Sequence, residues 1–398
     1  MLKLVRGVTF FWLLALGVTS FLVLLTPSIV LMLVPLSPVV SLRRWYGDLL
    51  VGLFLDYSAV GLLMLGGTKV SLYTNEKEIF NDRGTLLLCN HRTRVDWMYA
   101  GWVYNMMCRN NKTLRFIMKD ELRAVPVFGW VMQIVMCIFL NRKNKERDLM
   151  ELTQKAKYLQ SSGARPSVFL FPEGTDLSPE SVAKAHVFAK ERQLPLLDYV
   201  LYPKVAGMCA LLHAMKGNGG AVHDITIAYE DHVKGQRTNE KSIFSGQYPK
   251  HIHLCVRRFE LDDLPSDKHM AERWLKGSFL KKERLLKSFY ESDHVVPQDR
   301  SSGNKDVEVW PPKVHTPDPS MLSFFIVLGW DVCLVLGMAY VPEMRWLLFA
   351  LIVVCTAVKS LFRGFDVLEL GMHGGSSERG SRDGGRGSST DEAKDKKH

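Results

Sequence analysis

The amino-terminal part of the chain is the feature that most limits how the molecule can fold. No charged side chain occurs from residue 7 to residue 42. A helix needs about 20 apolar residues to cross a bilayer core, so this stretch can span a membrane or double back, and Pro27, Pro35 and Pro38 interrupt its second half. A cleavable signal peptide has an apolar core of only about 7–15 residues. We therefore predict an uncleaved membrane anchor.

Other apolar segments follow later in the chain. Residues 321–341 carry only one charge, Asp331, and residues 346–358 carry none. The short joint between them predicts a helical hairpin in the membrane. An aspartate there indicates either a functional site or a polar contact with a neighbouring helix, and the sequence favours neither. Residues 49–66, interrupted by Asp56, fit a membrane-surface helix or a helix buried in a soluble core.

Charge and cysteine usage narrow the class of protein. The net charge is +10, which in a membrane protein indicates attraction to anionic headgroups, and Arg43 and Arg44 directly follow the first apolar stretch. No nucleic-acid recognition motif accompanies the basic balance, so nucleic acid is not an expected partner. The seven cysteines are scattered without a Cys-x-x-Cys pair, a pattern typical of a reducing compartment.

The region between residues 67 and 296 is typical of a globular domain. Helical stretches such as 147–160 and 179–192 alternate with short apolar runs at 85–89, 114–118, 135–140, 167–171, 199–201, 224–229 and 252–259. This alternation predicts an α/β fold: a mixed or largely parallel sheet of about seven strands flanked by helices, with membrane helices at both termini. Residues 267–290 predict a basic amphipathic helix that is either solvated on the domain or in contact with the membrane surface.

The expected domain organisation follows from these segments. The membrane anchor and interfacial helix occupy 1–66, the globular domain 67–296, a proline-rich polar linker 297–319 and the membrane hairpin 320–363. Residues 371–398 contain too few apolar side chains to form a core, so we expect a disordered tail. Lys394 and Lys396 lie five and three positions from the end, which resembles a dilysine retrieval signal of endoplasmic-reticulum membrane proteins.

Residues 90–97, Asn-His-Arg-Thr-Arg-Val-Asp-Trp, directly follow the apolar run 85–89. A tight turn into a helix would bring Asp96 to His91, and a carboxylate that orients an imidazole is the usual apparatus for taking a proton from a hydroxyl. By spacing alone, a surface histidine and a helix-capping aspartate fit equally well. The apolar run 169–171 leads to Pro-Glu-Gly-Thr at 172–175, and the run 138–140 leads to Arg142, whose planar guanidinium suits a phosphate.

Two further histidines lie at the beginning of the predicted strand 252–259. His251 and His253 alternate with one residue, which places both imidazoles on one face of the strand. A metal site needs further ligands that the sequence does not identify. We therefore interpret the pair as structural and predict no metal.

These blocks together resemble the glycerophospholipid acyltransferases, the family typified by 1-acylglycerol-3-phosphate acyltransferases. The likeness follows the family's order: His-x-x-x-x-Asp in 90–96, a strand ending in arginine at 138–142, Pro-Glu-Gly-Thr at 172–175, and a strand followed by proline at 200–203. The branch of lysocardiolipin acyltransferases is most similar, through 90–97, 171–177, 222–229 and 286–290. The resemblance implies His91 as general base and Asp96 as its orienting partner.

The resemblance also implies a substrate site and a reaction. The expected substrate-binding residues are Arg142, Glu173, Gly174, Thr175, Asn90, Thr93 and Lys119. His91 would deprotonate the free hydroxyl of a lysophospholipid for direct attack on the thioester of acyl-CoA, with no prosthetic group and no covalent acyl-enzyme. Thr93 stands where the family pattern has serine. Asp176 stands where many 1-acylglycerol-3-phosphate acyltransferases have arginine, which disfavours a phosphate monoester and favours lysocardiolipin or another headgroup-bearing lysolipid.

Three alternatives remain open at this point. They are an enzyme that makes phosphatidic acid from 1-acylglycerol-3-phosphate, a transacylase that does not use CoA, and a protein that binds lipids without catalysis. The expected partners are acyl-CoA, a lysophospholipid and the bilayer, and the sequence identifies no protein partner. The expected location is the endoplasmic-reticulum membrane, with the catalytic domain in the cytosol. The acyl-chain preference, oxyanion donors and oligomeric state are not readable from the sequence.

Overall fold

The computed structural model describes residues 1–34, 36–76, 82, 84–107, 114–161, 166–217, 219–232, 236–292, 294, 296, 309–314 and 320–373. One mixed sheet forms its centre, in the order β4-β3-β5-β2-β6-β7-β1-β8. The strands are β1 (Lys69–Tyr73), β2 (Leu86–Cys89), β3 (Leu114–Lys119), β4 (Ile138–Leu140), β5 (Ser167–Leu170), β6 (Ala221–Glu230), β7 (His251–Glu260) and β8 (Lys313–Val314). From β4 to β6 all neighbours are parallel; β7 is antiparallel to β6 and parallel to β1, and β8 is antiparallel to β1.

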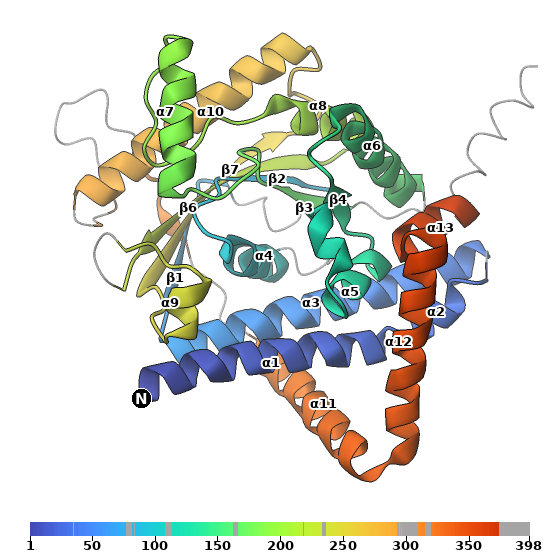
Figure 1. Ribbon diagram of the computed structural model, residues 1–398. Helices are drawn as coiled ribbons and strands as arrows, with labels where there is room; N and C mark the ends of the chain where they lie inside the picture. The colour runs from blue at the N-terminus through green and yellow to red at the C-terminus, as the bar shows by residue number, and fades with distance from the viewer. Residues whose placement is uncertain are drawn as a thin grey trace, which may run out of the picture.

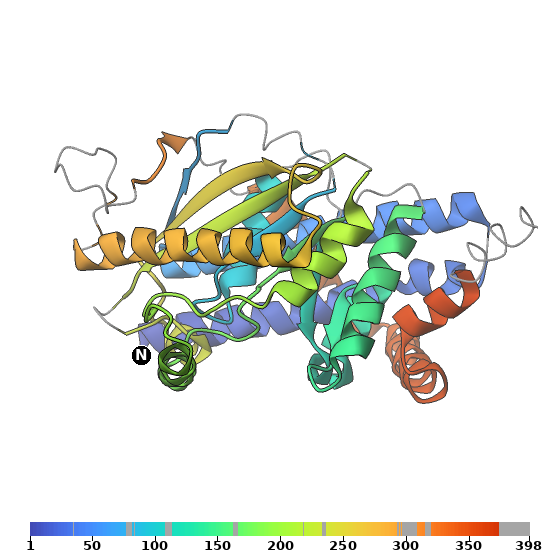
Figure 2. The ribbon, with the colours of Figure 1, turned by 90° about the horizontal axis from the view of Figure 1, so that it is seen from above.

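Helices cover both faces of the sheet (Figure 1). On one face lie α1 (Leu2–Leu24), α3 (Ser37–Gly66), α4 (Asp96–Met107) and α5 (Phe128–Ile134). On the other lie α6 (Lys145–Ser161), α8 (Val205–Met215) and α10 (Lys268–Glu291), and α10 runs along the sheet (Figure 2). Shorter elements between these are α2 (Thr26–Leu31), the 3-10 helix η2 (Asp120–Ala124), α7 (Pro179–Glu191) and α9 (Glu240–Phe244).

Burial on both faces explains the uninterrupted apolar composition of the parallel strands. In β2, Leu87 and Cys89 pack into the core beneath α3 and α4, whereas Leu86 and Leu88 pack into the core beneath α8 and α10. All four side chains are fully buried. The predicted α/β fold, with a largely parallel sheet flanked by helices, is confirmed.

The sequence expectations differ from the structure at three places. Residues 199–201 form no strand, because the N–H groups of residues 198–200 bond to the carboxylate of Glu283 instead of to a neighbouring strand. The predicted linker contributes the short edge strand β8, and Trp310 before it is buried. The first residues of the predicted disordered tail belong to α13 (Phe365–His373), and the rest of the tail, with the dilysine sequence, lies outside the described residues.

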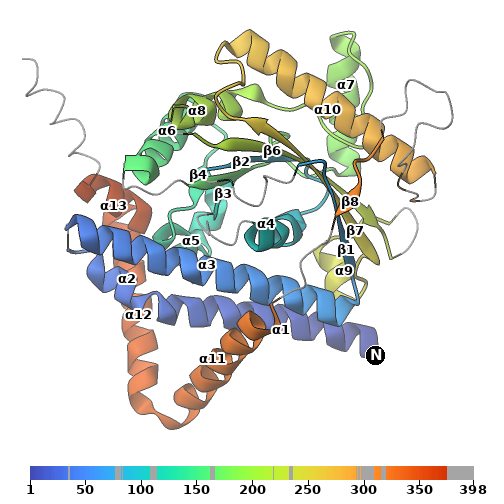
Figure 3. The same cartoon turned by 180° about the vertical axis from the view of Figure 1, so that it is seen from behind.

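The amino-terminal apolar stretch doubles back rather than forming one span. After α1 and the short α2, the chain reverses into α3, a helix of 30 residues that also contains the predicted surface helix. Helices α1 and α3 lie side by side, and α11 (Met321–Tyr340) and α12 (Pro342–Phe362) form the predicted hairpin (Figure 3). Within the described residues, four helical segments are long and apolar enough to cross a membrane: Leu2–Leu31, Pro38–Gly66, Met321–Tyr340 and Pro342–Phe362.

The surface of the hairpin requires an apolar environment. Large side chains such as Leu322, Phe325, Trp346 and Leu361 are more than half exposed, and they follow one another along α11 and α12. Apolar surface of this extent is rarely left to water in a soluble monomer. The helices therefore identify a membrane protein.

Asp331 of α11 resolves one of the alternatives that the sequence left open. Its carboxylate is buried and accepts hydrogen bonds from Ser20 of α1 at 2.5 Å and Tyr57 of α3 at 2.7 Å. In a bilayer, such bonds hold helices together because the alternative is an unpaired polar group in hydrocarbon. Of the two alternatives, Asp331 thus makes the polar contact with neighbouring helices.

The carboxyl-terminal helix α13 returns to the catalytic domain after the hairpin. Asp366 pairs with Lys155 at 2.5 Å and with Arg123 at 2.6 Å. Glu369 pairs with Arg43 at 2.5 Å, so Arg43 is buried rather than directed to lipid headgroups as its sequence position suggested. The two ends of the chain are therefore joined by ion pairs.

Candidate active site

The histidine–aspartate pair forms where β2 ends and α4 begins. The chain turns over residues 90–95, and α4 starts at Asp96. His91 Nδ1 lies 3.0 Å from Asp96 Oδ2, which also accepts from the backbone N–H of Thr93 at 2.9 Å. Because an ionised carboxylate only accepts, the proton of a neutral imidazole sits on Nδ1 and the lone pair on Nε2. The pair therefore has the arrangement of a general base.

An aromatic ring packs against one face of the imidazole. The ring of His91 stacks on Phe171 with centroids 4.0 Å apart, and its side chain is 17% exposed while Asp96 is fully buried. Phe171 directly follows β5, the parallel neighbour of β2. Adjacent parallel strands end at the same edge of a sheet, which is where residues from separate loops meet.

Tyr229 is a site residue that the sequence reasoning did not single out. Its hydroxyl donates to Asp96 Oδ1 at 2.6 Å from β6, the other neighbour of β2. Burial and the Asp96 carboxylate raise the pKa of Tyr229 well above its ordinary value, so the phenol remains a donor. The only sequence signal was its position in the block 222–229 that resembles the acyltransferase branch.

Glu173 lies behind the site rather than in it. Its carboxylate accepts from the backbone N–H groups of His91 at 2.8 Å and Leu201 at 3.0 Å, and the residue is 3% exposed. Both oxygens are thus occupied by the protein's own loops. Glu173 was expected to bind substrate; the geometry instead makes it a positioning residue that holds three loops together.

Asn90 and Thr93, also expected in the substrate site, share this supporting position. The side-chain amide of Asn90 bonds to the backbone of Ile227 in both directions, at 2.8 and 3.2 Å. Thr93 contributes its N–H to Asp96, and its side chain is buried. Neither residue lines the cavity that opens beside His91.

That cavity has a volume of about 910 Å³. His91 lines it together with Lys119, Arg142, Gly174 and Thr175, which the sequence analysis had also placed in the substrate site. Its far wall is apolar and comes from the membrane helices α1 and α3, through Val18, Phe21, Val51, Phe54 and Leu55. The cavity therefore connects the histidine to apolar side chains of the membrane helices.

Arg142 is held at the cavity in an unusual backbone conformation. Its φ of 64° is in the left-handed region that residues with a Cβ seldom adopt. Asp148 stabilises this turn by accepting from the N–H groups of Asn141 at 2.8 Å and Arg142 at 2.7 Å. The guanidinium donates to the carbonyl of Gly174 at 2.6 Å. Burial lowers the pKa of Arg142, although the group remains a cation at neutral pH.

Gly174 faces Arg142 from the Pro-Glu-Gly-Thr turn. Its φ of 77° is again left-handed, which glycine adopts without strain. A Cβ there would lie 3.2 Å from Lys204 Nζ. Lys204, Lys145 and Lys268 also line the cavity; they come from loops and helix ends that gave no signal in the sequence.

Asp176, the departure from the family pattern, has a cationic partner. Arg94 Nε lies 3.7 Å from its carboxylate, and Arg94 also reaches Glu240 at 3.3 Å. Both Arg94 and Asp176 line the cavity. The anionic side chain is therefore at the place where the family pattern has a cation.

A histidine oriented by a carboxylate, next to cations and an apolar cavity between membrane helices, is the arrangement expected of a membrane enzyme that acts on lipids. Comparison with known proteins specifies the class further. The family model described as "Acyltransferase" matches residues 71–229, and "Acyltransferase C-terminus" matches residues 242–330. The chain belongs to the glycerophospholipid acyltransferase family.

Individual relatives extend over most of the chain. Lysocardiolipin acyltransferase 1 of Danio rerio is 33% identical over 290 residues, covering 72% of each protein. The protein of the same name from Gallus gallus is 29% identical over 355 residues, covering 86% of this chain and 90% of the relative. Lysophosphatidylinositol acyltransferase 10 of Caenorhabditis elegans is 31% identical over 253 residues, 61% of this chain. The protein is thus an acyltransferase of the lysophospholipid and acylglycerol-phosphate type.

Proposed function

We propose that the protein transfers a fatty acyl group from acyl-CoA to the free hydroxyl of a lysophospholipid that carries a headgroup. The observation that carries the proposal is the position of His91 on the wall of the cavity, with Asp96 on its Nδ1 and Arg142 on the same wall. The product is a diacyl phospholipid, so the reaction remodels membrane lipids.

The proposed reaction is a direct transfer. His91 Nε2 takes the proton of the acceptor hydroxyl as its oxygen attacks the thioester carbonyl. Collapse of the tetrahedral intermediate breaks the carbon–sulfur bond, and the CoA thiolate takes the proton back from the imidazolium. Asp96 stabilises the imidazolium while it exists. The step uses no prosthetic group, and acyl-CoA serves as co-substrate.

Charge at the cavity supports a phosphorylated donor. Six cationic residues line it, Arg94, Lys119, Arg142, Lys145, Lys204 and Lys268, against three anionic ones, Glu121, Asp148 and Asp176. Cations concentrated along one cleft attract an anionic substrate, and both CoA and a phospholipid carry phosphates. The apolar wall from α1 and α3 suits the acyl chain.

The acceptor is proposed from Asp176. An anion beside the phosphate site repels the doubly charged phosphate of 1-acylglycerol-3-phosphate more strongly than a singly charged diester. Two of the relatives are named for acceptors of the diester kind, lysocardiolipin and lysophosphatidylinositol. A relative from Mus musculus, 27% identical over 269 residues, is named 1-acyl-sn-glycerol-3-phosphate acyltransferase epsilon, which keeps the monoester as the second candidate.

The decisive experiment measures transfer of a radiolabelled acyl group from oleoyl-CoA to a panel of lysophospholipids, with membranes containing wild-type protein, His91→Ala or His269→Ala. His269 is exposed on α10 and controls for the loss of a histidine. We expect His91→Ala to lose about 10²–10⁴-fold and His269→Ala to match wild type. Equal activity of all three would refute His91 as base; transfer only from a labelled phospholipid would favour the CoA-independent transacylase; no transfer at all would favour a binding protein.

The acceptor is tested separately with Asp176→Arg and Asp176→Asn. We expect the arginine variant to raise the ratio of activity on 1-acylglycerol-3-phosphate to activity on lysocardiolipin, because the charge at the phosphate changes sign. The asparagine variant, which only removes the anion, should raise this ratio less. A wild-type protein that already prefers the monoester would contradict the proposed acceptor and leave the acyltransferase reaction intact.

The location is also proposed: the endoplasmic-reticulum membrane, with the catalytic domain in the cytosol. Supporting it, both ends of the helical hairpin lie on the side of the catalytic domain, since α13 docks on that domain. Cytosolic acyl-CoA then reaches the cavity directly.

A further inference from the structure

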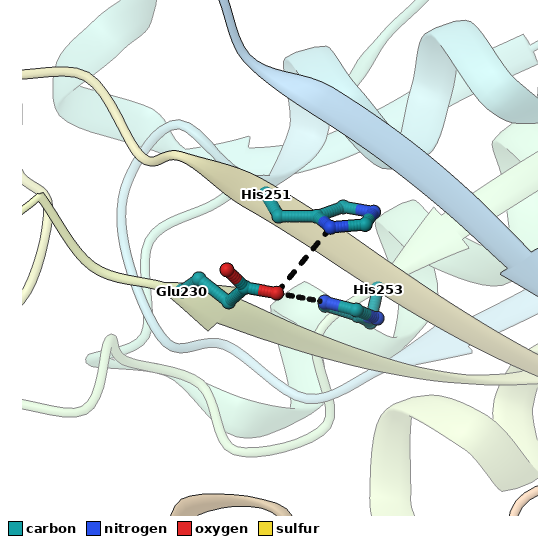
Figure 4. A group of neighbouring side chains, drawn as sticks. All are labelled: Glu230, His251 and His253. Carbon is teal, nitrogen blue, oxygen red and sulfur yellow. Dashed lines mark hydrogen bonds and ion pairs between the residues drawn. The ribbon is translucent and has the colours of Figure 1, made fainter. Parts of the chain in front are cut away.

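Three side chains converge on one point at the edge of the sheet that holds β6, β7 and β1. His251 and His253 alternate on β7, and Glu230 is the last residue of β6, directly paired with His251 in the antiparallel register. Figure 4 shows both imidazoles and the carboxylate directed toward one another from the neighbouring strands. Glu230 is the further ligand that the sequence could not identify, because only strand pairing brings it to the histidines.

The distances between the facing atoms match a metal coordination shell. Glu230 Oε1 lies 3.3 Å from His251 Nδ1 and 3.0 Å from His253 Nε2. All three ligand atoms lie within 4.8 Å of one another. Tetrahedral bonds of about 2.0–2.2 Å from Zn²⁺ to nitrogen and oxygen place neighbouring ligand atoms about 3.3–3.5 Å apart. The two oxygen–nitrogen distances are therefore at most a few tenths of an ångström shorter than those of such a coordination shell.

The far sides of both imidazoles are already held. His251 Nε2 bonds to Ser71 Oγ at 2.8 Å, and His253 Nδ1 bonds to the hydroxyl of Tyr73 at 3.0 Å. Both partners lie on β1, which runs parallel beside β7. In metal sites the second ring nitrogen is usually fixed in this way, which orients the ring and directs the free nitrogen to the metal.

Two cations lie near the cluster: Lys69 is paired with His251 in the register of β1 and β7, and Lys313 is paired with Tyr73. The single negative charge of Glu230 is therefore needed to favour a metal cation. The side chain of Glu230 is 30% exposed, which leaves space for water ligands.

We propose that Glu230, His251 and His253 bind one divalent metal ion of the Zn²⁺ type, with water completing the coordination. Two imidazoles and one carboxylate suit Zn²⁺ and its first-row neighbours rather than Mg²⁺ or Ca²⁺, which prefer oxygen ligands. The site is separate from the catalytic pair but lies beside residues that support it. Tyr229 and Asp231, on either side of Glu230, form hydrogen bonds with Asp96 and Arg92 respectively. The ion therefore stabilises the strand end that supports the catalytic loop.

The test uses the full chain, purified in detergent without a metal-affinity step and stripped of metal. We expect one equivalent of Co²⁺ to produce visible absorption bands of four- or five-coordinate cobalt, and Zn²⁺ to displace it. Mg²⁺ and Ca²⁺ should not. Absence of such bands and of Zn²⁺ binding by calorimetry would overturn the proposal and leave a hydrogen-bonded structural cluster.

Variants assign the site. Glu230→Gln and His251→Gln keep polar side chains of similar size. Each should weaken Zn²⁺ binding by at least about tenfold, because loss of a residue that only hydrogen-bonds to a metal ligand already weakens binding by about 10–100-fold. His186→Gln is the matched control, because His186 also pairs with a carboxylate, Asp198 at 3.0 Å, outside this cluster. Metal binding that is unchanged in both site variants, or lost equally in the control, would contradict the assignment. The wild-type titration decides the existence of the site even if one variant fails to fold.

Discussion

Tyr229 and Glu173 show how buried polar residues outside the reacting pair fix the catalytic geometry. Every oxygen of Asp96 and Glu173 accepts at least one hydrogen bond from the protein. A buried carboxylate without partners would cost about 1–3 kcal/mol or more. These bonds therefore leave His91 one orientation, in which Nε2 is the free base.

The first prediction concerns the hydroxyl of Tyr229. Tyr229→Phe should lower kcat about 10–100-fold with little change in KM, because a hydrogen bond to a charged group contributes about 1.5–3 kcal/mol. Steady-state kinetics with oleoyl-CoA would measure this. Tyr99→Phe is the control, since Tyr99 packs edge-on against Tyr229 but does not bond to Asp96. A Tyr229→Phe enzyme as active as the control would show that Asp96 needs no third partner.

The second prediction is a pH dependence of stability that comes from Glu173. Burial raises its pKa from 4.5 to about 8, although the two backbone N–H donors act in the opposite direction. Between these values the folded protein binds more protons than the unfolded chain, so stability decreases as pH rises. The contribution is complete below about pH 4.5 and is lost as the pH passes through about 8.

Thermal unfolding in detergent from pH 5 to pH 8.5 tests this behaviour. We expect Glu173→Gln to flatten the decline of the unfolding midpoint with pH, because glutamine does not titrate. Glu180→Gln, on the exposed surface of α7, should retain the wild-type slope. Parallel curves for wild type and Glu173→Gln would show that the carboxyl group titrates elsewhere.

At the level of elements, the register of three parallel strands assembles the site. Strand β2 lies between β5 and β6. His91 follows the end of β2, the Pro-Glu-Gly-Thr turn follows the end of β5, and Tyr229 is the last residue but one of β6.

Helix α13 has a different role: it adds no residue to the cavity but fixes the hairpin to the catalytic domain through buried charges. Although burial alone would raise the pKa of Asp366, Lys155 and Arg123 hold it below its ordinary value.

The third prediction concerns this attachment. Asp366→Asn leaves Lys155, which is fully buried, without its strongest anionic partner, so we expect a loss of about 3–5 kcal/mol in the free energy of unfolding. Asp120→Asn removes another carboxylate from the same Arg123 but at a site that is 38% exposed, and should cost at most about 1 kcal/mol. Denaturant unfolding in detergent measures both; equal losses would mean that α13 does not stabilise the domain.

For the whole molecule, the packing of the membrane helices against the sheet places the cavity next to the bilayer. Helices α1 and α3 supply both membrane surface and the apolar wall of the cavity. In the proposed reaction, the acyl chain would lie against this apolar wall and the phosphate near Arg142 and Lys119, which line the same cavity. The hairpin of α11 and α12 adds an anchor whose apolar side chains are exposed on the protein.

The fourth prediction concerns topology. Because the hairpin returns the chain to the catalytic domain, a protease-sensitive tag placed after His398 should be digested in sealed microsomes without detergent, on the same side as the domain. A luminal protein serves as the control for sealed vesicles and should be cleaved only after detergent is added. Protection of the tag in intact microsomes would contradict the cytosolic orientation, and a protected tag with a digested catalytic domain would contradict the hairpin.

The residues of the proposed catalytic pair could be found in the sequence because they are close together in it. His91 and Asp96 are separated by one turn of chain, and Arg142 and Gly174 come within four residues of the ends of apolar strands; the alternation of those strands with helices also gave the fold class. The strand expected at 199–201 was wrong because a single distant carboxylate, Glu283, took its N–H groups. Local apolar composition does not record such a competitor.

Contacts between segments far apart in the chain were decided only by the tertiary structure. Tyr229 reaches Asp96 across 133 positions and Glu173 reaches His91 across 82, and Glu230 joins the two histidines only through the register of β6 and β7. The sequence by itself determined which segments are apolar, which are helical and where reactive side chains follow a strand, because these depend on neighbours along the chain. Which buried polar groups satisfy one another depends on strand order and helix packing, and only the folded molecule specifies that.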